Sequence, residues 1–158
     1  MIKVAILTVS DSCSQGERDD VSGQTIKNML DADKFEICEY KIVADEHRSI
    51  KEALIYFADE LKANIVLTTG GTGLGPRDVT PEATMAVCEK MVPGLAEAMR
   101  LEGLKKTKNA MLSRAVAAMR GNTLIINLPG SPKAVKESLE VVLDVLPHAK
   151  DMLLGKGH

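Results

Sequence analysis

The chain has 158 residues, of which 45% are hydrophobic and 27% are charged, and its formal net charge at pH 7 is −2. These values are typical of an ordinary globular protein, and we expect a single domain over residues 1–158. Acidic and basic residues are mixed along the chain and only 3% of residues are aromatic. Neither the basic surface nor the base-stacking platform of a nucleic-acid-binding protein is therefore expected.

A membrane protein and a zinc-binding protein are also disfavoured by the sequence. No hydrophobic run approaches the roughly 20 residues that a membrane-spanning helix requires, and the first residues indicate a strand rather than a leader. The three cysteines, Cys13, Cys38 and Cys88, form no Cys-x-x-Cys pair, which indicates reduced thiols in a cytoplasmic protein. A zinc site is not expected, because the histidines are scattered: His47, His148 and His158.

The first part of the chain alternates between expected strands and helices. Residues 3–9 form a near-continuous apolar run, as in a strand that is covered on both faces. The polar loop 10–20 leads into a short helix. Residues 35–43 alternate in the manner of a second strand, and residues 49–61 place apolar side chains on one face of a helix.

The alternation continues to the end of the chain. Residues 63–67 predict a third buried strand, followed by helices from Pro81 to about Lys90 and from Pro93 to Gly103. The composition of 113–119 favours helix locally, but the turn residues at 120–123 favour a hairpin into a buried strand.

The last expected elements complete the same pattern. Residues 124–128 form the strand after that turn, and two helices follow, one to about Leu146 and one from Pro147 to Leu154. Strands that alternate with helices predict an α/β fold with a mostly parallel sheet.

The most distinctive stretch is 68–82, TTGGTGLGPRDVTPE, which places four glycines between a strand end and a helix start. Thr80 is the expected N-cap of that helix and Pro81 its first residue. Glycine permits positive φ, and successive N–H groups beside a helix N-terminus bind anions, most often phosphate. The alternative is a glycine-rich surface turn before a well-capped helix. The stretch matches neither of the usual nucleotide-binding glycine patterns.

Charged and polar residues accompany this loop. Arg77 adds fixed positive charge, and Asp78 adds a hard oxygen ligand suited to a Mg²⁺ that bridges phosphates. Further polar loops, at 10–11, 45–46 and 129–131, follow the other expected strands. Because the carboxyl ends of parallel strands share one edge of a sheet, these loops are expected to converge there.

Each candidate for a ligand-binding residue could instead have a purely structural role. Asp11 also suits the start of a polar turn, and Asp45 also suits the cap of the helix that follows it. Ser131 is a good helix N-cap as well as a candidate ligand-binding residue. Cys13 has no electropositive setting and is interpreted as a bystander. No Ser-His-Asp relay is evident, which favours handling of phosphate with Mg²⁺ by positioning and charge stabilisation.

Five segments of the chain form a recognisable set: 10–12 (SDS), 45–46 (DE), 68–84 (TTGGTGLGPRDVTPEAT), 113–114 (SR) and 127–132 (NLPGSP). Through these segments the sequence resembles the MogA/MoaB family of molybdenum cofactor biosynthesis, which includes a domain of gephyrin. The resemblance covers essentially the full chain in the expected order. One position departs from it, since Ala44 stands where many members carry proline, and alanine leaves that loop less rigid.

The resemblance implies a three-layer α/β/α sandwich that usually assembles as a homotrimer. In the MogA branch it implies a molybdopterin adenylyltransferase, which transfers AMP from Mg-ATP to molybdopterin and releases pyrophosphate. It implies that Asp45 and Asp78 are the catalytic acids, and the Mg²⁺ chemistry assigns the metal to the same pair. The phosphate-binding and pocket residues that it implies are Ser10, Gly70, Gly71, Thr72, Gly73 and Ser131.

Three alternatives remain. A MoaB-like protein would bind molybdopterin or nucleotide without, or with undefined, adenylyltransferase activity, although segment 77–82 favours the MogA branch. A carrier or scaffold would keep the pocket, but mere binding does not require Asp45 and Asp78. A nicotinamide oxidoreductase on a Rossmann-type sheet is disfavoured, because the glycines follow the third strand with the wrong spacing.

Overall fold

The computed structural model describes residues 1–156, so Gly157 and His158 lie outside the described part of the chain. The strands are β1 (Ile2–Val9), β2 (Phe35–Val43), β3 (Ile65–Thr69), β4 (Lys90–Met91), β5 (Ala117–Arg120) and β6 (Thr123–Leu128). They form one sheet in the order β2-β1-β3-β6-β5-β4. The first four strands in that order run parallel, and the hairpin strand β5 and the edge strand β4 are antiparallel to their neighbours. The predicted mostly parallel α/β fold is confirmed.

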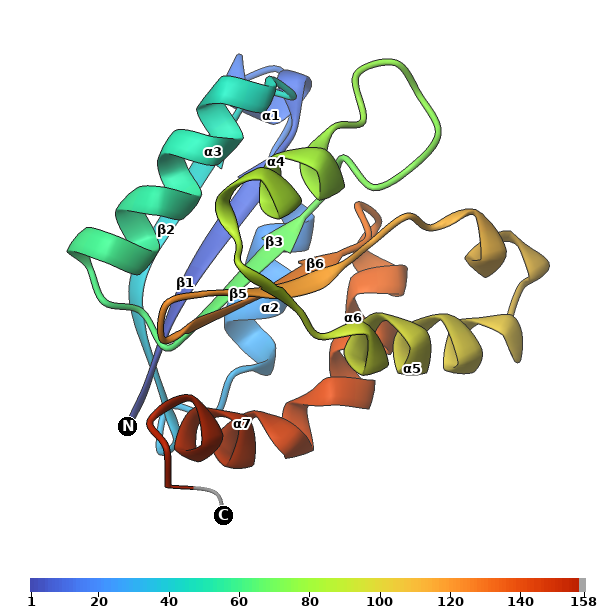
Figure 1. Ribbon diagram of the computed structural model, residues 1–158. Helices are drawn as coiled ribbons and strands as arrows, with labels where there is room; N and C mark the ends of the chain where they lie inside the picture. The colour runs from blue at the N-terminus through green and yellow to red at the C-terminus, as the bar shows by residue number, and fades with distance from the viewer. Residues whose placement is uncertain (157–158) are drawn as a thin grey trace.

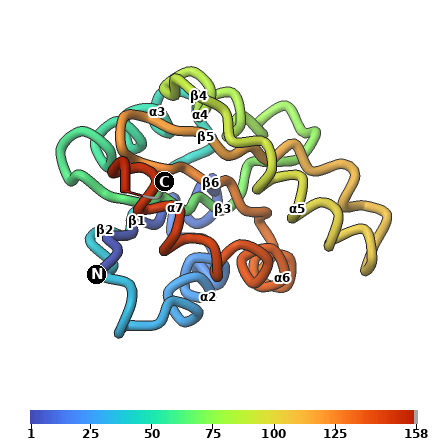
Figure 2. Tube along the Cα trace, turned by 60° about the horizontal axis from the view of Figure 1, so that its bottom comes forward, coloured from blue at the N-terminus to red at the C-terminus, as the bar shows by residue number. Residues whose placement is uncertain are grey.

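Helices cover both faces of the sheet and make three layers. Figure 2 shows α3 and α4 on one side of the strands and α2 and α6 on the other. A π-helical turn, η1 (Tyr56–Glu60), extends α3, and two short 3₁₀ turns are η2 (Lys108–Leu112) and η3 (Leu143–Val145). The α-helices are α1 (Asp11–Ser14), α2 (Val21–Met29), α3 (His47–Ile55), α4 (Thr80–Val87), α5 (Pro93–Leu104), α6 (Pro132–Val142) and α7 (Leu146–Leu153).

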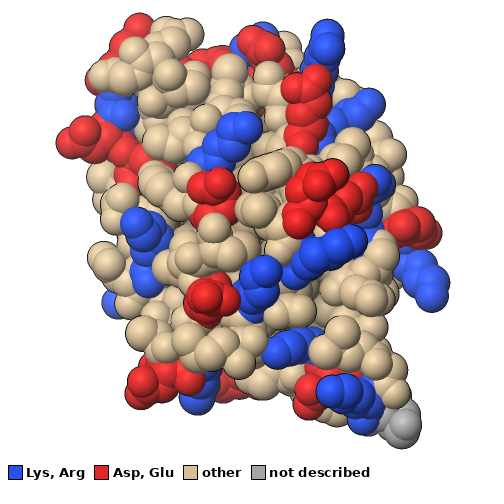
Figure 3. All heavy atoms as spheres, turned by 90° about the vertical axis from the view of Figure 1, so that its left-hand side faces the viewer, with Lys and Arg blue, Asp and Glu red and all other residues tan. Residues whose placement is uncertain are grey.

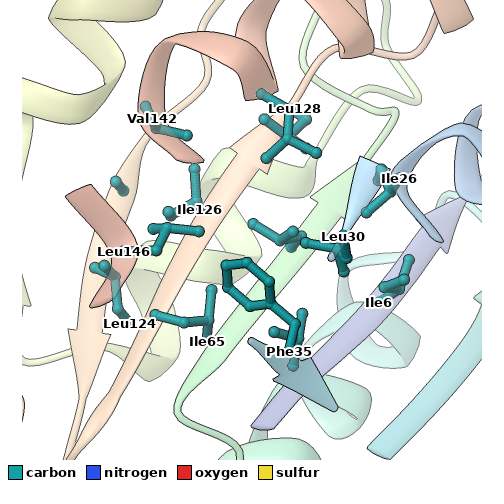
Figure 4. Packing of buried hydrophobic residues seen from close by; sticks show 14 of the residues in the cluster. Ile6, Ile26, Leu30, Phe35, Ile65, Leu124, Ile126, Leu128, Val142 and Leu146 are labelled. Carbon is teal, nitrogen blue, oxygen red and sulfur yellow. The ribbon is translucent and has the colours of Figure 1, made fainter. Parts of the chain in front are cut away.

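Each face of the sheet buries its own hydrophobic cluster, because successive side chains in a strand point to opposite faces. In β1, Ile6 packs in the cluster with α2 and α6, whereas Leu7 packs in the cluster with α3 and α4. Figure 4 shows the first cluster, in which Ile26 of α2 and Ile126 of β6 are among the labelled side chains. The apolar runs found in the sequence are therefore strands buried on both faces.

The register of the sheet brings the loops after four strands to one edge. Val9 at the end of β1 pairs with Val43 at the end of β2, and Thr69 at the end of β3 pairs with Leu128 at the end of β6. Figure 1 shows the loop between β3 and α4 extending from this carboxyl end of the sheet. The predicted convergence of the loops is confirmed at the level of the backbone.

The region after β3 corrects two expectations. Val79 occupies the N-cap position of α4, so the prediction that Thr80 is the cap is wrong. The reason is that the Thr80 hydroxyl is buried and donates to the carbonyl of Gly70 at 2.9 Å. Helix α4 also ends at Val87 rather than near Lys90, because Lys90 and Met91 pair with β5 as a two-residue edge strand.

The segment for which the sequence left helix and strand open is β5. It pairs antiparallel with β6 through the turn at 121–122, where Gly121 has a φ of +56°. That positive φ suits glycine, and the hairpin interpretation is confirmed.

The surface carries both signs of charge. On the face drawn in Figure 3, acidic and basic side chains are interspersed rather than gathered into a patch of one sign. Among residues 1–156, no helix combines the length and the apolar character needed to span a bilayer.

Candidate active site

Two glycines allow the chain to turn sharply where β3 ends. Gly70 has a φ of +96°, and a Cβ there would lie 2.2 Å from the backbone oxygen of Val9. Gly71 has a φ of +71°, and a Cβ there would lie 2.2 Å from the Thr80 hydroxyl. A side chain at either position would be strained by the backbone and would also clash, so the loop path depends on glycine.

The backbone amides of this loop divide into two groups. The N–H of Gly70 donates to the carbonyl of Leu128 at 3.3 Å, so this amide, one of four expected to hold phosphate, already serves the sheet. No hydrogen bond within residues 1–156 uses the N–H groups of Gly71, Thr72 or Gly73. Three successive amides are thus left with donating capacity, which an anion-binding loop requires.

Asp45 is held by a reciprocal exchange with the loop after β1. The Asp11 N–H donates to Asp45 Oδ2 at 2.9 Å, and the Asp45 N–H donates to Asp11 Oδ1 at 3.0 Å. The alternative that Asp45 caps α3 is wrong, because Glu46 occupies the cap position. The exchange fixes Asp45 despite the absence of proline at Ala44.

The two acids of this pair lie in different electrostatic settings. Burial raises the pKa of the Asp45 carboxyl, and the negative charges of Asp11 and Asp78 act in the same direction. The pKa of Asp11 is instead lowered, because Arg77 donates to both of its oxygens, at 3.1 and 2.9 Å. A cation near Asp45 would relieve the repulsion between neighbouring carboxylates.

Asp78 folds its carboxylate back onto its own loop. Its Oδ2 accepts the N–H of Gly75 at 2.9 Å. A Cβ on Gly73 or on Gly75 would lie 2.9 Å from the same oxygen. The absence of a side chain at these two glycines therefore leaves space for the Asp78 carboxylate.

Ser10 and Ser131 both cap helices. Ser10 Oγ accepts the N–H of Cys13 at 3.2 Å, and Ser131 Oγ accepts the N–H of Ala134 at 3.3 Å. The N-cap alternative for Ser131 is confirmed. Both serines also line the polar cavity described next, so the structure brings them to the glycine loop without assigning them a ligand.

Two cavities meet at the carboxyl end of the sheet. The polar cavity, of about 870 Å³, is lined by both Asp45 and Asp78 together with the loops after β1, β3 and β6. A larger cavity, of about 1100 Å³, lies between the glycine loop, α5 and α6. The two share Gly71, Asp78 and Gly130. Groups bound in the two cavities would approach each other at Asp78.

The acids fit a Mg²⁺ ion that is held jointly with phosphate. Within residues 1–156, no group of three or more His, Cys, Asp or Glu side chains is arranged to hold a metal by itself. Asp45 and Asp78 each keep one carboxylate oxygen that no hydrogen bond within the described chain engages. Mg²⁺ in nucleotide sites commonly takes one or two carboxylates plus substrate phosphates, and this pair meets that requirement.

Sequence reasoning assigned no role to three residues that organise this end of the sheet, although two of them lie in segments that carry the family resemblance. Asp20 accepts hydrogen bonds from the Thr8 hydroxyl, from the Tyr40 hydroxyl and from the N–H of Gly23. The buried amide of Asn127 donates to hydroxyls of β3 and α4, and Arg114 contacts the glycine loop. The sequence signal for Asn127 was a lone polar residue inside the apolar run of β6.

The fold and the site define a class of protein. It is an α/β protein whose mostly parallel sheet carries a glycine-rich loop and two acids at its carboxyl edge, the edge at which such sheets bind their ligands. Residues 5–148 match the family model described as a probable molybdopterin-binding domain. The chain belongs to that family, the MogA/MoaB family of molybdenum cofactor biosynthesis.

Individual relatives match over nearly the full chain. A molybdopterin adenylyltransferase of Helicobacter pylori strain J99 is 46% identical over 156 residues, which are 98% of this chain and 89% of the relative. The molybdopterin adenylyltransferase of Escherichia coli K12 is 40% identical over 90% of this chain and 74% of its own length. The crystal structure of the molybdopterin biosynthesis enzyme MoaB from Thermus thermophilus is 54% identical, covers 99% of this chain and 98% of its own, and superposes with a TM-score of 0.93.

Proposed function

We propose that this protein is a molybdopterin adenylyltransferase, which transfers AMP from Mg-ATP to molybdopterin and releases pyrophosphate. The observation that carries the proposal is that Asp45 and Asp78 line one cavity together with the glycine loop. The relatives named molybdopterin adenylyltransferase support it, since one of them aligns over 98% of the chain. A single domain over residues 1–158 performs the reaction in this proposal.

The two cavities suit a reaction between two substrates. Each cavity holds one substrate, and the reacting phosphates meet where the cavities share Gly71, Asp78 and Gly130. A phosphate oxygen of molybdopterin attacks the α-phosphorus of ATP, a new P–O bond forms, and the bond to the β-phosphate bridging oxygen breaks. The bridging oxygen leaves with pyrophosphate, so atoms and charge balance.

The residues contribute by position and charge rather than by proton transfer. The amides of Gly71, Thr72 and Gly73 donate to phosphate oxygens as negative charge develops on the leaving group. Asp45 and Asp78 are the residues that would hold Mg²⁺ and orient the attacking phosphate of molybdopterin. Mg²⁺ supplies neutralisation of the triphosphate charge when it is bound. Ser10 and Ser131 line the pocket from two helix caps.

The direct test measures pyrophosphate release from ATP by the purified protein with Mg²⁺. We expect release only when molybdopterin is added, with one adenylylated molybdopterin formed per pyrophosphate. Pyrophosphate formation that is independent of molybdopterin, or no formation at all, contradicts the proposal.

A second candidate is a MoaB-like protein that binds molybdopterin or nucleotide without this transfer. The observation that favours it is the 54% identity to the structure named MoaB. Isothermal titration distinguishes the two: binding of both ligands with no turnover supports the second candidate. The pair of acids in the polar cavity, of which Asp78 also lines the second cavity, favours the enzyme, because mere binding does not require it.

The proposal also covers the oligomeric state of the protein and its cellular compartment. We propose a homotrimer, since the resemblance implies it and since α5 and η2 expose apolar side chains that a second copy would cover. These are Leu101, Leu104, Met111 and Leu112. The three free cysteines are consistent with a reducing cytoplasm. Light scattering after size-exclusion chromatography tests the trimer, and a mass near 17.0 kDa would contradict it.

A further inference from the structure

Arg114 reaches the glycine loop from the segment that precedes β5. Its backbone N–H donates to the carbonyl of Thr72 at 2.9 Å. Its side chain donates through Nε to the carbonyl of Gly73 at 2.8 Å and through Nη2 to the carbonyl of Asp78 at 2.7 Å. One guanidinium group therefore holds both ends of the segment 73–78.

Glu82, in the first turn of α4, orients this guanidinium group. Arg114 Nη1 donates to Glu82 Oε2 at 2.6 Å, and Nη2 donates to Oε1 at 3.2 Å. The Arg114 and Glu82 side chains keep 35% and 42% of their accessible surface. Ion pairs with this exposure contribute little to global stability, so the role of the pair is geometric rather than stabilising.

The hydrogen bonds of Arg114 to Gly73 and Asp78 hold the two ends of a segment that joins the loop amides to the Asp78 carboxylate, and the proposed reaction requires these groups at a fixed distance. The free amides of Gly71, Thr72 and Gly73 lie at one end of it, and the carboxylate of Asp78 lies at the other. Between them the segment is closed only locally, by the bonds between Gly75 and Asp78. If the ends of the segment drifted, phosphate and metal would be offered in the wrong relative position.

We propose that Arg114 is a positioning residue, which fixes the segment 73–78 so that the loop amides and the Asp78 carboxylate face the same reacting phosphate. This inference rests on the proposed function. A lysine at position 114 would keep the charge pair with Glu82, but a single ammonium group lacks the planar fork that bridges two carbonyls and a carboxylate. The geometry of the donors, and not the charge alone, is what the site uses.

Arg120 offers a matched control at the opposite end of the sheet. It donates to both oxygens of Asp59, at 3.1 and 2.7 Å, and to the carbonyl of Val87 at 2.8 Å. It has the same type of ion pair and carbonyl contact, but its hydrogen bonds go to Asp59 and Val87 and to no residue of the segment 72–79. Comparing Arg114→Lys with Arg120→Lys separates loop positioning from a general loss of stability.

The experiment measures three quantities for each variant: the melting temperature, the kcat and KM for ATP, and amide hydrogen exchange of residues 72–79. We expect Arg114→Lys to lower kcat at least about 10-fold, with a smaller change in KM and faster exchange in 72–79, since small misplacements at a reacting centre are costly. Arg120→Lys should leave kcat and exchange in 72–79 unchanged, while both variants shift the melting temperature by similar amounts.

Glu82→Gln provides a second variant that keeps Arg114 in place. It weakens the orienting pair and should lower kcat by about 3-fold, with a smaller increase in exchange, because a neutral amide accepts a weaker hydrogen bond. If Arg114→Lys and Glu82→Gln match Arg120→Lys in kcat and in exchange of 72–79, the inference is overturned. If the wild-type protein transfers no AMP, the proposed function fails, and the exchange measurement still decides whether Arg114 fixes the loop.

Discussion

The two ends of the parallel sheet are built from the same kinds of contact but leave different groups unused. At the amino end, Asn64 exchanges hydrogen bonds with the backbone of Lys3, and the Thr123 hydroxyl donates to the carbonyl of Ala63 at 2.6 Å. At the carboxyl end, the Thr80 hydroxyl similarly donates to the carbonyl of Gly70. At each end, therefore, a threonine hydroxyl donates to a carbonyl of the chain just outside β3.

The difference lies in what remains after this pairing. The bonds named at the amino end join polar groups of the protein to one another, whereas the carboxyl end keeps three loop amides and two carboxylate oxygens without a partner in the described chain. This end of the sheet therefore has hydrogen-bonding and ligating capacity for a phosphate and a metal. Substitutions at the amino end are expected to change stability alone, and substitutions at the carboxyl end are expected to change activity more than stability.

The largest expected effect is that of Asp78→Asn. Asparagine keeps the shape and the acceptor for the Gly75 N–H but removes the charge that holds Mg²⁺, so turnover should fall by about 10³-fold. The measurement is formation of adenylylated molybdopterin, with molybdopterin binding followed in parallel by fluorescence. Loss of binding together with turnover would show that the charge serves the substrate site rather than the reaction.

The next effect concerns the core, which lies between the two ends. Leu54 of α3 is fully buried, and Leu54→Ala should lower the free energy of unfolding by about 3 kcal/mol through lost burial and a cavity. Urea denaturation measures this change. Well below the melting temperature the folded variant should retain wild-type kcat, and a large loss of kcat there would contradict the separation of core from site.

A smaller effect distinguishes the hydroxyls of Thr80 and Thr123, which donate to carbonyls on either side of β3. Thr80→Val and Thr123→Val each leave a buried carbonyl without its donor, and each should cost about 1–2 kcal/mol of unfolding free energy. Only Thr80→Val should also lower kcat, because Gly70 is the point from which the glycine loop departs. Equal kcat in the two variants would remove the functional distinction between the ends of the sheet.

The smallest expected effect is a gain in stability. Burial raises the pKa of Asp45 in the folded state, so the ionised carboxylate destabilises the fold at neutral pH. Asp45→Asn should therefore raise the melting temperature by about 1–2 °C at pH 7 while it lowers activity. As the pH falls through the raised pKa of Asp45, the wild-type carboxyl becomes neutral and the difference should vanish. Calorimetry between pH 4 and pH 8 measures it, and a difference that grows on acidification has the wrong sign.

The sequence predicted the parts of this molecule that depend on local pattern. Apolar runs and alternation predicted the principal strands, because burial imposes a period on neighbouring side chains. The hairpin was predicted from the turn residues before β6. The two-residue strand β4 was not predicted, since Lys90 and Met91 are too short a segment to carry a period and both are exposed.

The site was predictable in position but not in its contacts. Parallel topology alone placed Asp45 and Asp78 at one edge, and the structure brings both to one cavity. The exchange between Asp11 and Asp45 joins residues 34 apart in sequence, and the bond from Arg114 to Gly73 spans 41 residues. Such contacts follow from the packed geometry, so propensities and spacing carry no signal for them.

The most direct test of the central claim is a crystal structure of the protein with Mg²⁺ and a non-hydrolysable ATP analogue. We predict phosphate oxygens within hydrogen-bond distance of the amides of Gly71, Thr72 and Gly73, and one metal ion ligated by Asp45, Asp78 and phosphate. Phosphates bound at the amino end of the sheet, or a metal that contacts neither acid, would contradict the account.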